Sequence, residues 1–249
     1  MIASLPMYAR AFNRAAHDAL WHLIRDELRD RGITAPDQLD HNIDYMEVWD
    51  RDDLVLGHIC NLPYRALFRD KVTLIGASDY GLPDCPAGYY NSLFIARSPG
   101  TPADFAARYA CNDLLSQSGY GAAQLWAQRE RFTLNVVTVT GSHNASIAAV
   151  AKGTADLASI DAQTWRLEQA EGNPRLRDLH IIGQTSASPG MSFITRRDQD
   201  PAPYRDAIDA AINGLPRAHR QVLGLRAIVS LSEDAYDIPL PPKPEAFAH

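Results

Sequence analysis

The chain has 249 residues, of which 46% are hydrophobic and 22% charged, a composition typical of a folded water-soluble protein. A formal net charge of −6 and the lack of any long Lys/Arg run argue against nucleic acid as a partner, because a phosphate backbone is bound by a basic surface. The three cysteines, Cys60, Cys85 and Cys111, have no C-x-x-C spacing, which argues against a disulfide framework or a zinc site. We expect neither a metal nor a cofactor.

In the first half of the chain, a short strand is expected at residues 1–5 and a helix at 17–31, where apolar residues recur at helical spacing before Gly32. The apolar runs at 54–60 (LVLGHIC), 71–77 (KVTLIGA) and 90–97 (YNSLFIAR) predict buried strands. The last of these ends at the turn signal Ser98-Pro99-Gly100.

In the second half, strand-like and helix-like segments alternate. We expect strands at 107–113, 133–139, 155–160, 180–185 and 192–195, and helices at 119–131, 142–152, 162–169, 206–215 and 217–224. The proline-rich tail from residue 239 is expected to lie extended on the surface. The alternation predicts an α/β protein with largely parallel sheets, and the length favours two lobes. Ligands of such sheets bind where the carboxyl ends of strands lead into helices.

One such loop has the sequence NDLLSQSGY, with Ser116, Gln117, Ser118 and Gly119 just before a predicted helix. The serines are candidates for simple helix capping, which is common. They are also candidates for a cradle around an anion, since the first N–H groups of a helix are unpaired and carry partial positive charge. Glycine would then let the backbone approach the oxyanion closely. Both interpretations stay open.

Two further strand-to-helix loops repeat this design. Gly141-Ser142-His143 leads into the helix expected at 142–152, and a histidine at this helix start can donate a charge-assisted hydrogen bond to an anion. Asp161 begins the helix at 162–169, either as its N-cap or as a partner of His143 or of the ligand.

The first half of the chain offers further polar groups near the ends of its strands, and we include them as ligand-binding candidates: Tyr8, His58, Asn61 and Tyr90. The sequence has no G-x-x-x-x-G-K-[ST] loop, no H-E-x-x-H and no G-x-S-x-G elbow. We therefore assign no catalytic residue.

The motifs together resemble one family. NDLLSQSGY, VTGSHNASIAAVAKGTADLASIDAQTW and IIGQTSASPGMSFIT are similar, in this order, to segments of the PhnD-like phosphate, phosphite and phosphonate-binding proteins of ABC transporters. The resemblance implies a type II periplasmic-binding-protein fold, with two α/β lobes joined by two crossover strands. Lobe 1 would comprise residues 1–93 and 188–249, and lobe 2 residues 94–187.

The resemblance also implies a site and a function. The oxyanion would be surrounded in a cleft between the lobes by Tyr90, Ser116, Gln117, Ser118 and His143. Met191 stands where binders of aminoalkylphosphonates often carry an acid, so a cationic tail is not expected on the ligand. The protein would bind a phosphorus oxyanion without chemical change and serve an ABC permease, without being an integral membrane protein.

Two alternatives remain open at this stage. One is an enzyme on the same fold, with Asp161, His143 or Cys60 as acid, base or nucleophile; the other is a ligand-sensing regulatory module with a partner protein. The resemblance implies the periplasm, whereas the first residues, MIASLPMYARAF, lack the pattern of an export leader and favour the cytoplasm.

Overall fold

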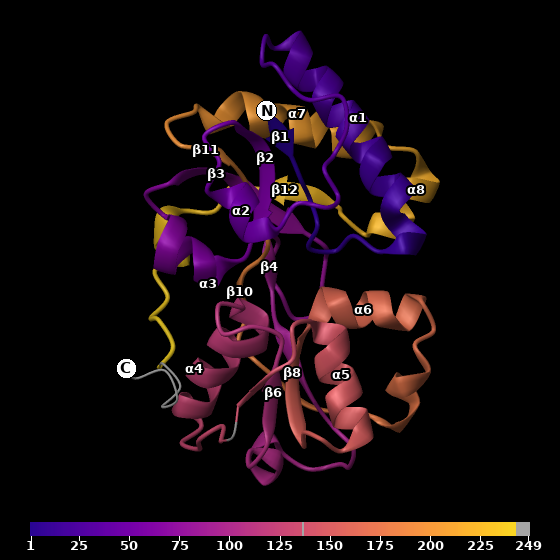
Figure 1. The fold of residues 1–249 in the computed structure, drawn as a ribbon, viewed down its shortest axis with the longest axis vertical. Coiled ribbons are helices and arrows are strands. Elements are labelled where there is room, and N and C mark those ends of the chain that lie inside the picture. Colours follow the sequence, from indigo (N-terminus) through magenta and orange to yellow (C-terminus); the bar gives the residue numbers. More distant parts are fainter. Residues whose placement is uncertain (136, 243–249) are drawn as a thin grey trace. The chain divides into compact units, whose positions relative to one another are not determined.

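The computed structural model describes residues 1–135 and 137–242, which fold into two compact units (Figure 1). Unit 1 comprises Met1–Tyr89 and Pro189–Tyr236. Unit 2 comprises Tyr90–Ser188 and, among the described residues, those from Asp237 onward. The chain therefore passes between the units three times. The sequence placed the tail in the first lobe, whereas in the structure Tyr120 of unit 2 donates a hydrogen bond from its hydroxyl to Pro242 O at 2.7 Å.

Unit 1 is built on a five-stranded sheet in the order β1-β2-β11-β3-β12. Its strands are β1 (Ile2–Ala3), β2 (Leu54–Ile59), β3 (Val72–Asp79), β11 (Ser192–Arg196) and β12 (Ala227–Val229). β1 is parallel to β2, whereas β11 is antiparallel to both β2 and β3, and β12 is antiparallel to β3. The central strand β11 thus comes from the part of the chain that has returned from unit 2.

The helices of unit 1 pack around this sheet. They are α1 (Arg14–Asp30), α2 (Tyr45–Trp49), α3 (Asn61–Pro63), the π-helical turn Tyr64–Phe68, α7 (Pro201–Gly214), α8 (Arg217–Leu223) and the 3-10 turns Ala11–Asn13 and Glu233–Tyr236. α1 packs against α7 and buries Trp21, Ile24 and Leu28 completely. Near the other helices, Trp49, Phe68 and Ile194 form part of a second apolar core.

Unit 2 has its own five-stranded sheet, in the order β7-β6-β8-β5-β9. Its strands are β5 (Ser92–Ala96), β6 (Tyr109–Cys111), β7 (Thr138–Val139), β8 (Leu157–Asp161) and β9 (His180–Gln184). Its helical segments are α4 (Ala122–Arg129), α5 (His143–Lys152), α6 (Ala162–Ala170), the π-helical turn Gln117–Gly121 and the 3-10 turns Pro102–Phe105 and Pro174–Asp178. Where the chain crosses between units, β4 (Tyr89–Tyr90) and β10 (Ser188–Pro189) form a two-stranded sheet.

Alternate residues of the unit 2 strands supply two separate cores. Phe94 and Tyr109 belong to one apolar cluster, and their chain neighbours Ile95 and Ala110 belong to another. Successive side chains of a strand point to opposite faces, so both faces of the sheet are covered. This double burial explains why the strand at β8 reads as an almost continuous apolar run.

The prediction of largely parallel sheets is wrong. β6 is parallel to β7 and β8, but β5 is antiparallel to β8 and β9. In each unit, one strand follows a passage of the chain from the other unit: β5 in unit 2 and β11 in unit 1. This strand is antiparallel to both of its neighbours in the sheet. Hydrophobic period identifies a strand but carries no information about its direction.

Candidate functional site

The loop that the sequence singled out forms a closed π-helical turn after β6 and leads directly into α4. Ser116 is its N-cap: the side-chain Oγ accepts a hydrogen bond from Gly119 N at 3.0 Å. The backbone oxygen of the same serine accepts from Tyr120 N at 3.0 Å and from Gly121 N at 2.9 Å. The capping interpretation of Ser116 is therefore confirmed. The Ser116 hydroxyl accepts the bond from Gly119 N through its oxygen and keeps its own O–H as a donor.

Two buried hydroxyl groups hold the turn from the sheet below it. Ser159 Oγ, on β8, donates to Ser118 O at 2.8 Å, and the Tyr109 hydroxyl, on β6, donates to Gly119 O. Both donor residues are fully buried. Sequence reasoning missed them, and the available signal was the small polar Ser159 inside the apolar run LASID.

Gly119 is packed closely against Asn112 of the same unit. A Cβ atom at this position would lie 1.8 Å from Asn112 Oδ1 and 3.3 Å from Asn112 N. The sequence interpretation gave Gly119 the task of letting a ligand approach. The structure supplies a reason that needs no ligand, namely the close approach of Asn112.

A hydrogen bond joins the turn to the start of α5. Ser118 Oγ lies 2.9 Å from His143 Nε2, and Ser116 Oγ lies 3.2 Å from Ser118 Oγ. His143 is the first residue of α5, whose N-cap Ser142 accepts from Ala145 N at 3.1 Å. Two hydroxyls and an imidazole are thereby placed beside a helix start, where N–H groups have no intrahelical partner. Such a group of donors suits an anion.

The other predicted residues of unit 2 have different surroundings. Gln117 is buried, and its Nε2 lies 3.4 Å from Ser188 Oγ on β10, so the side chain is directed toward the crossover strand. Asp161 is the N-cap of α6 and accepts from Thr164 N at 2.9 Å. Tyr90 is buried in β4. A ligand contact from any of these three stays a prediction.

The predicted residues of unit 1 are engaged in its interior. His58 is 4% exposed; its Nε2 lies 2.7 Å from Ser78 Oγ, and its ring stacks on Phe193 at 4.6 Å between centroids. Tyr8 packs edge-on against His58 at 6.3 Å. Together with His17 they line a cavity of about 20 Å³, room for a single water molecule.

Asn61 is likewise buried within unit 1, where its amide oxygen has a partner but its Nδ2 has none among the described residues. It is 1% exposed, and its Oδ1 accepts a hydrogen bond from Arg65 Nη1, one turn along the same helical segment. His58 faces residues of α1 and α8 in the cavity just described, because strand alternation turns it to the face those helices cover. We therefore leave His58 out of the site proposed below, whereas a ligand contact from Asn61 stays a prediction.

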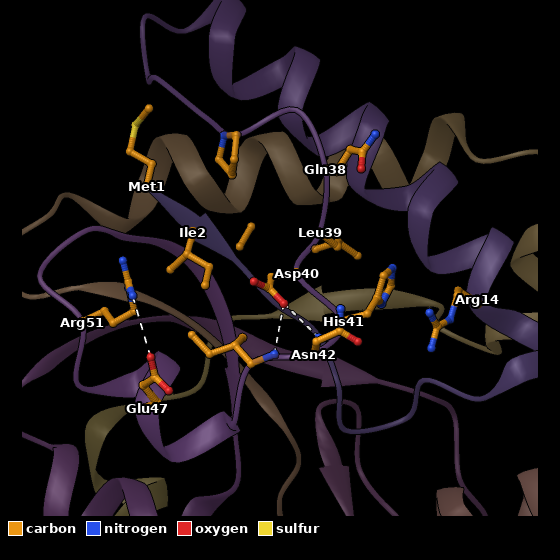
Figure 2. Close-up of a pocket in the computed structure, with 13 residues that line it drawn as sticks. Met1, Ile2, Arg14, Gln38, Leu39, Asp40, His41, Asn42, Glu47 and Arg51 are labelled. Carbon is orange, nitrogen blue, oxygen red and sulfur yellow. Dashed lines mark hydrogen bonds and ion pairs between the residues drawn. The ribbon is translucent and has the colours of Figure 1, made fainter.

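An open hollow of about 900 Å³ also lies on unit 1 and is drawn in Figure 2. It is lined by residues that precede or form β1 and by the loop around Asp40. Asp40 Oδ1 accepts from Asn42 N and Ile43 N, so this carboxylate is used in a turn. The hollow also borders Arg51, which precedes β2, so it lies near the amino end of that strand and not at the carboxyl end where ligands bind.

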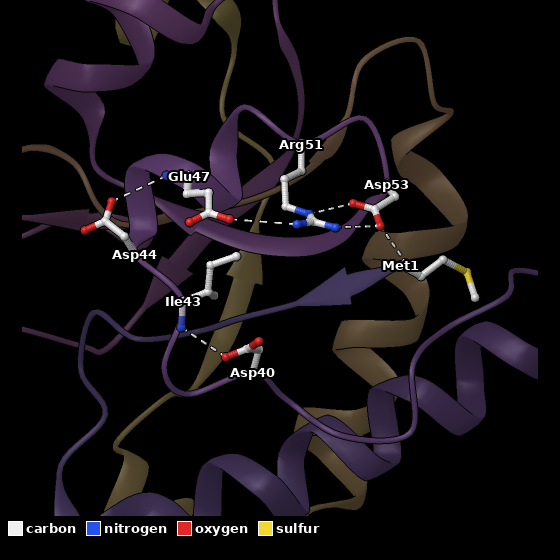
Figure 3. A network of polar contacts seen from close by, with 7 residues as sticks. All are labelled: Met1, Asp40, Ile43, Asp44, Glu47, Arg51 and Asp53. Atoms are coloured by element: carbon white, nitrogen blue, oxygen red, sulfur yellow. Dashed lines mark hydrogen bonds and ion pairs between the residues drawn. The ribbon is translucent and has the colours of Figure 1, made fainter.

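The charged groups near the amino end of β2 form ion pairs with one another (Figure 3). Arg51 Nε donates to Asp53 Oδ1 at 2.7 Å, and its Nη1 lies 3.9 Å from Glu47 Oε1. The amino group of Met1 donates to Asp53 Oδ2 at 2.7 Å. These hydrogen bonds lower the pKa of the Asp53 carboxyl well below its usual range. The network is exposed and mutually paired, which makes it a solvated surface and not an anion site.

The sequence matches a known family over most of its length. Residues 45–236 match the family described as "ABC transporter, phosphonate, periplasmic substrate-binding protein". The chain belongs to this family. It is therefore a substrate-binding protein of the ABC transporter type, which binds a small ligand and works with a permease, and the prediction that it is not an enzyme is confirmed by family membership. No curated protein sequence matches the chain.

Three of the solved structures with a similar fold serve as examples. PhnD1 of Prochlorococcus marinus, in complex with methylphosphonate, is 15% identical with a TM-score of 0.67, over 95% of this chain and 94% of that one. A Xanthomonas citri protein bound to ATP has the same identity and TM-score, over 94% and 92%. A binding protein component of an ABC phosphonate transporter from Pseudomonas aeruginosa is 17% identical with a TM-score of 0.64, over 94% and 82%.

These similarities establish the two-lobed fold of periplasmic binding proteins, which confirms the predicted fold class. In the described part of the chain, no helix combines the length and the apolar character needed to cross a membrane. Nor do the described residues contain a cluster of three or more His, Cys, Asp or Glu side chains suited to holding a metal ion.

Gly119→Ala is expected to destabilise the protein by about 1–3 kcal/mol, the usual range for overpacking, because the new methyl group collides with Asn112. Chemical denaturation measures the change. Asn112→Ala in the same chain should recover most of the loss. Gly214→Ala is the matched control, since a Cβ there meets open space. Equal losses at both glycines would contradict the steric explanation.

His58 should make the protein sensitive to acid. Burial, with a smaller effect of His17, lowers the pKa of His58 from 6.5 to about 3. The unfolded chain then binds the extra proton between these values, so the free energy of unfolding falls as pH decreases below 6.5. The loss between pH 7.5 and pH 5 is about 2 kcal/mol from this residue.

Denaturation curves at several pH values test this expectation. His58→Gln should flatten the dependence on pH, whereas His180→Gln, which replaces an exposed histidine, should leave it steep. Burial also lowers the pKa of His17, so part of the slope should remain in His58→Gln. An unchanged slope in that variant would show that His58 is not buried in its neutral form.

Proposed function

We propose that the ligand is a small phosphorus oxyanion, such as methylphosphonate, phosphite or phosphate, and that unit 2 binds it at the Ser116–Ser118–His143 cluster. The observation that carries the proposal is the 2.9 Å contact between Ser118 Oγ and His143 Nε2 at the start of α5. It joins hydroxyl donors, an imidazole and helix N–H groups at one point. Further support comes from family membership and from the methylphosphonate held by a protein of similar fold.

The cluster suits such an anion for three reasons. Hydroxyl and N–H donors bind oxyanions without placing a fixed cation in the site, so release stays possible. His143 can take up a proton when the anion arrives, which strengthens its hydrogen bond. Each serine hydroxyl both donates and accepts, so it can also receive the P–OH proton of a singly protonated ligand.

We propose further that the protein lies in the periplasm and delivers this ligand to an ABC permease. Ser118 and His143 also have the spacing of a nucleophile and its base, but in this proposal their hydrogen bond only orders the two side chains before the ligand binds. The ligand would leave unaltered. Incubation with methylphosphonate followed by ³¹P NMR checks this: a new phosphorus signal would contradict it.

A thermal-shift and calorimetry panel tests the ligand class, with phosphate, phosphite, methylphosphonate, sulfate, acetate and malate. At a hundredfold excess over Kd, the bound ligand should stabilise the protein by about 2.7 kcal/mol, or very roughly 5–10 °C in Tm. His143→Ala should weaken binding about 10- to 100-fold, the loss of one charged hydrogen bond.

His180→Ala serves as the matched control, because it removes an exposed histidine of the same unit. It should bind like the wild type. Sulfate, which carries no proton at neutral pH, separates recognition of a protonated oxyanion from attraction of any tetrahedral anion. Stabilisation by carboxylates alone, or full binding by His143→Ala, would overturn the proposal.

A further inference from the structure

Unit 2 contains a buried carboxylate that lies outside the cluster just described. Glu168, on α6, is 2% exposed. Its Oε2 accepts two side-chain amide hydrogen bonds, from Asn144 Nδ2 at 2.8 Å and from Asn173 Nδ2 at 2.7 Å. A buried carboxylate destabilises the fold unless hydrogen bonds compensate for the lost water, so these two amides are what makes the position tolerable.

The two amides belong to different parts of the unit. Asn144 follows His143 directly and lies in the first turn of α5. Asn173 lies in the turn after α6, where its backbone N–H donates to Glu168 O at 3.0 Å. The Glu168 carboxylate therefore connects the start of α5 to the end of α6, both drawn in Figure 1. Of the two amides, only Asn144 adjoins a residue of the cluster.

Other contacts also hold the start of α5. Ser142 caps Ala145 N, and Thr140 Oγ1 lies 2.7 Å from Ser146 Oγ and 3.0 Å from Cys111 O on β6. Further along the helix, Ile147 and Val150 are buried in an apolar core. These contacts place the side of α5 that faces the sheet, whereas the Asn144–Glu168 hydrogen bond holds its first turn from α6, directly beside the His143 that contacts Ser118 at 2.9 Å.

We propose that Glu168 is a positioning residue for the anion cluster. Through Asn144 it holds the first turn of α5, and so keeps the His143 imidazole at hydrogen-bonding distance from Ser118. The inference rests on the proposed function for its consequence in binding, but the placement of the imidazole is independent of any ligand.

The test compares four variants: Glu168→Ala, Glu168→Gln, Asn144→Ala and Asn173→Ala. Three quantities are measured: the Kd for methylphosphonate by calorimetry, Tm, and the ¹⁵N chemical shifts of the His143 ring in unliganded protein. Glu168→Ala and Asn144→Ala should raise Kd about 5- to 10-fold, since a displaced imidazole loses most of one hydrogen bond. Both should also shift the ring signals.

Asn173→Ala is the matched control. It removes the other amide that Glu168 accepts, so it should lower Tm to a similar extent while leaving Kd within twofold and the ring signals in place. Glu168→Gln keeps an acceptor oxygen for Asn144 without the charge, and it should restore most of the affinity. If Glu168→Ala does not fold, Asn144→Ala and Glu168→Gln still decide the question.

Three outcomes would overturn the inference. Wild-type Kd and ring signals in Asn144→Ala would show that the first turn needs no support from Glu168. An affinity loss in Asn173→Ala as large as in Asn144→Ala would indicate general loosening. A loss of affinity in Glu168→Gln equal to that in Glu168→Ala would show that the negative charge of Glu168, and not its hydrogen bond to Asn144, determines binding. If the wild type binds no phosphorus oxyanion, the proposed function fails, while the ring signals still test the placement of His143.

Discussion

The hydrogen bond between Ser118 and His143 is the contact on which the proposed site depends. It joins residues 25 positions apart, from two separate strand-to-helix loops of unit 2. Each partner is positioned by local hydrogen bonds. Ser118 lies in a turn that Ser116 caps and to which Ser159 donates a hydrogen bond, and His143 begins a helix that Ser142 caps. Neither loop by itself provides the donors that an anion needs.

The rigidity of the turn comes from buried polar contacts and from the fit around Gly119. Hydroxyl groups on β6 and β8 donate to the carbonyls of two successive residues, Ser118 and Gly119, and so bond the turn to the sheet. A sheet covered on both faces supplies these hydroxyls at fixed positions. The arrangement places the donors before the ligand arrives, which reduces the conformational entropy that binding must otherwise remove.

Unit 1 illustrates how a polar residue at a strand end can belong to the core. His58 lies at the carboxyl end of β2, where ligands of α/β sheets bind, yet its side chain packs on Phe193 and against residues of α1 and α8. The polar hollow near the amino end of that strand is bordered by Arg51 and Glu47, which form an ion pair. For neither His58 nor the hollow does the position in the sequence reveal whether a ligand can bind. The face to which a side chain points decides whether it meets solvent.

The sequence by itself determined the helix starts at Ser142 and Asp161, most strand positions, the family resemblance and the order of the serine and histidine motifs. These are local properties: capping residues and hydrophobic period act over a few residues of chain. Only the tertiary structure decided strand direction, the inward face of His58, the buried hydroxyls of Ser159 and Tyr109, and the carboxylate of Glu168. Each of these depends on partners distant in the chain or on which face of an element is covered, and neither is encoded in a short stretch of residues.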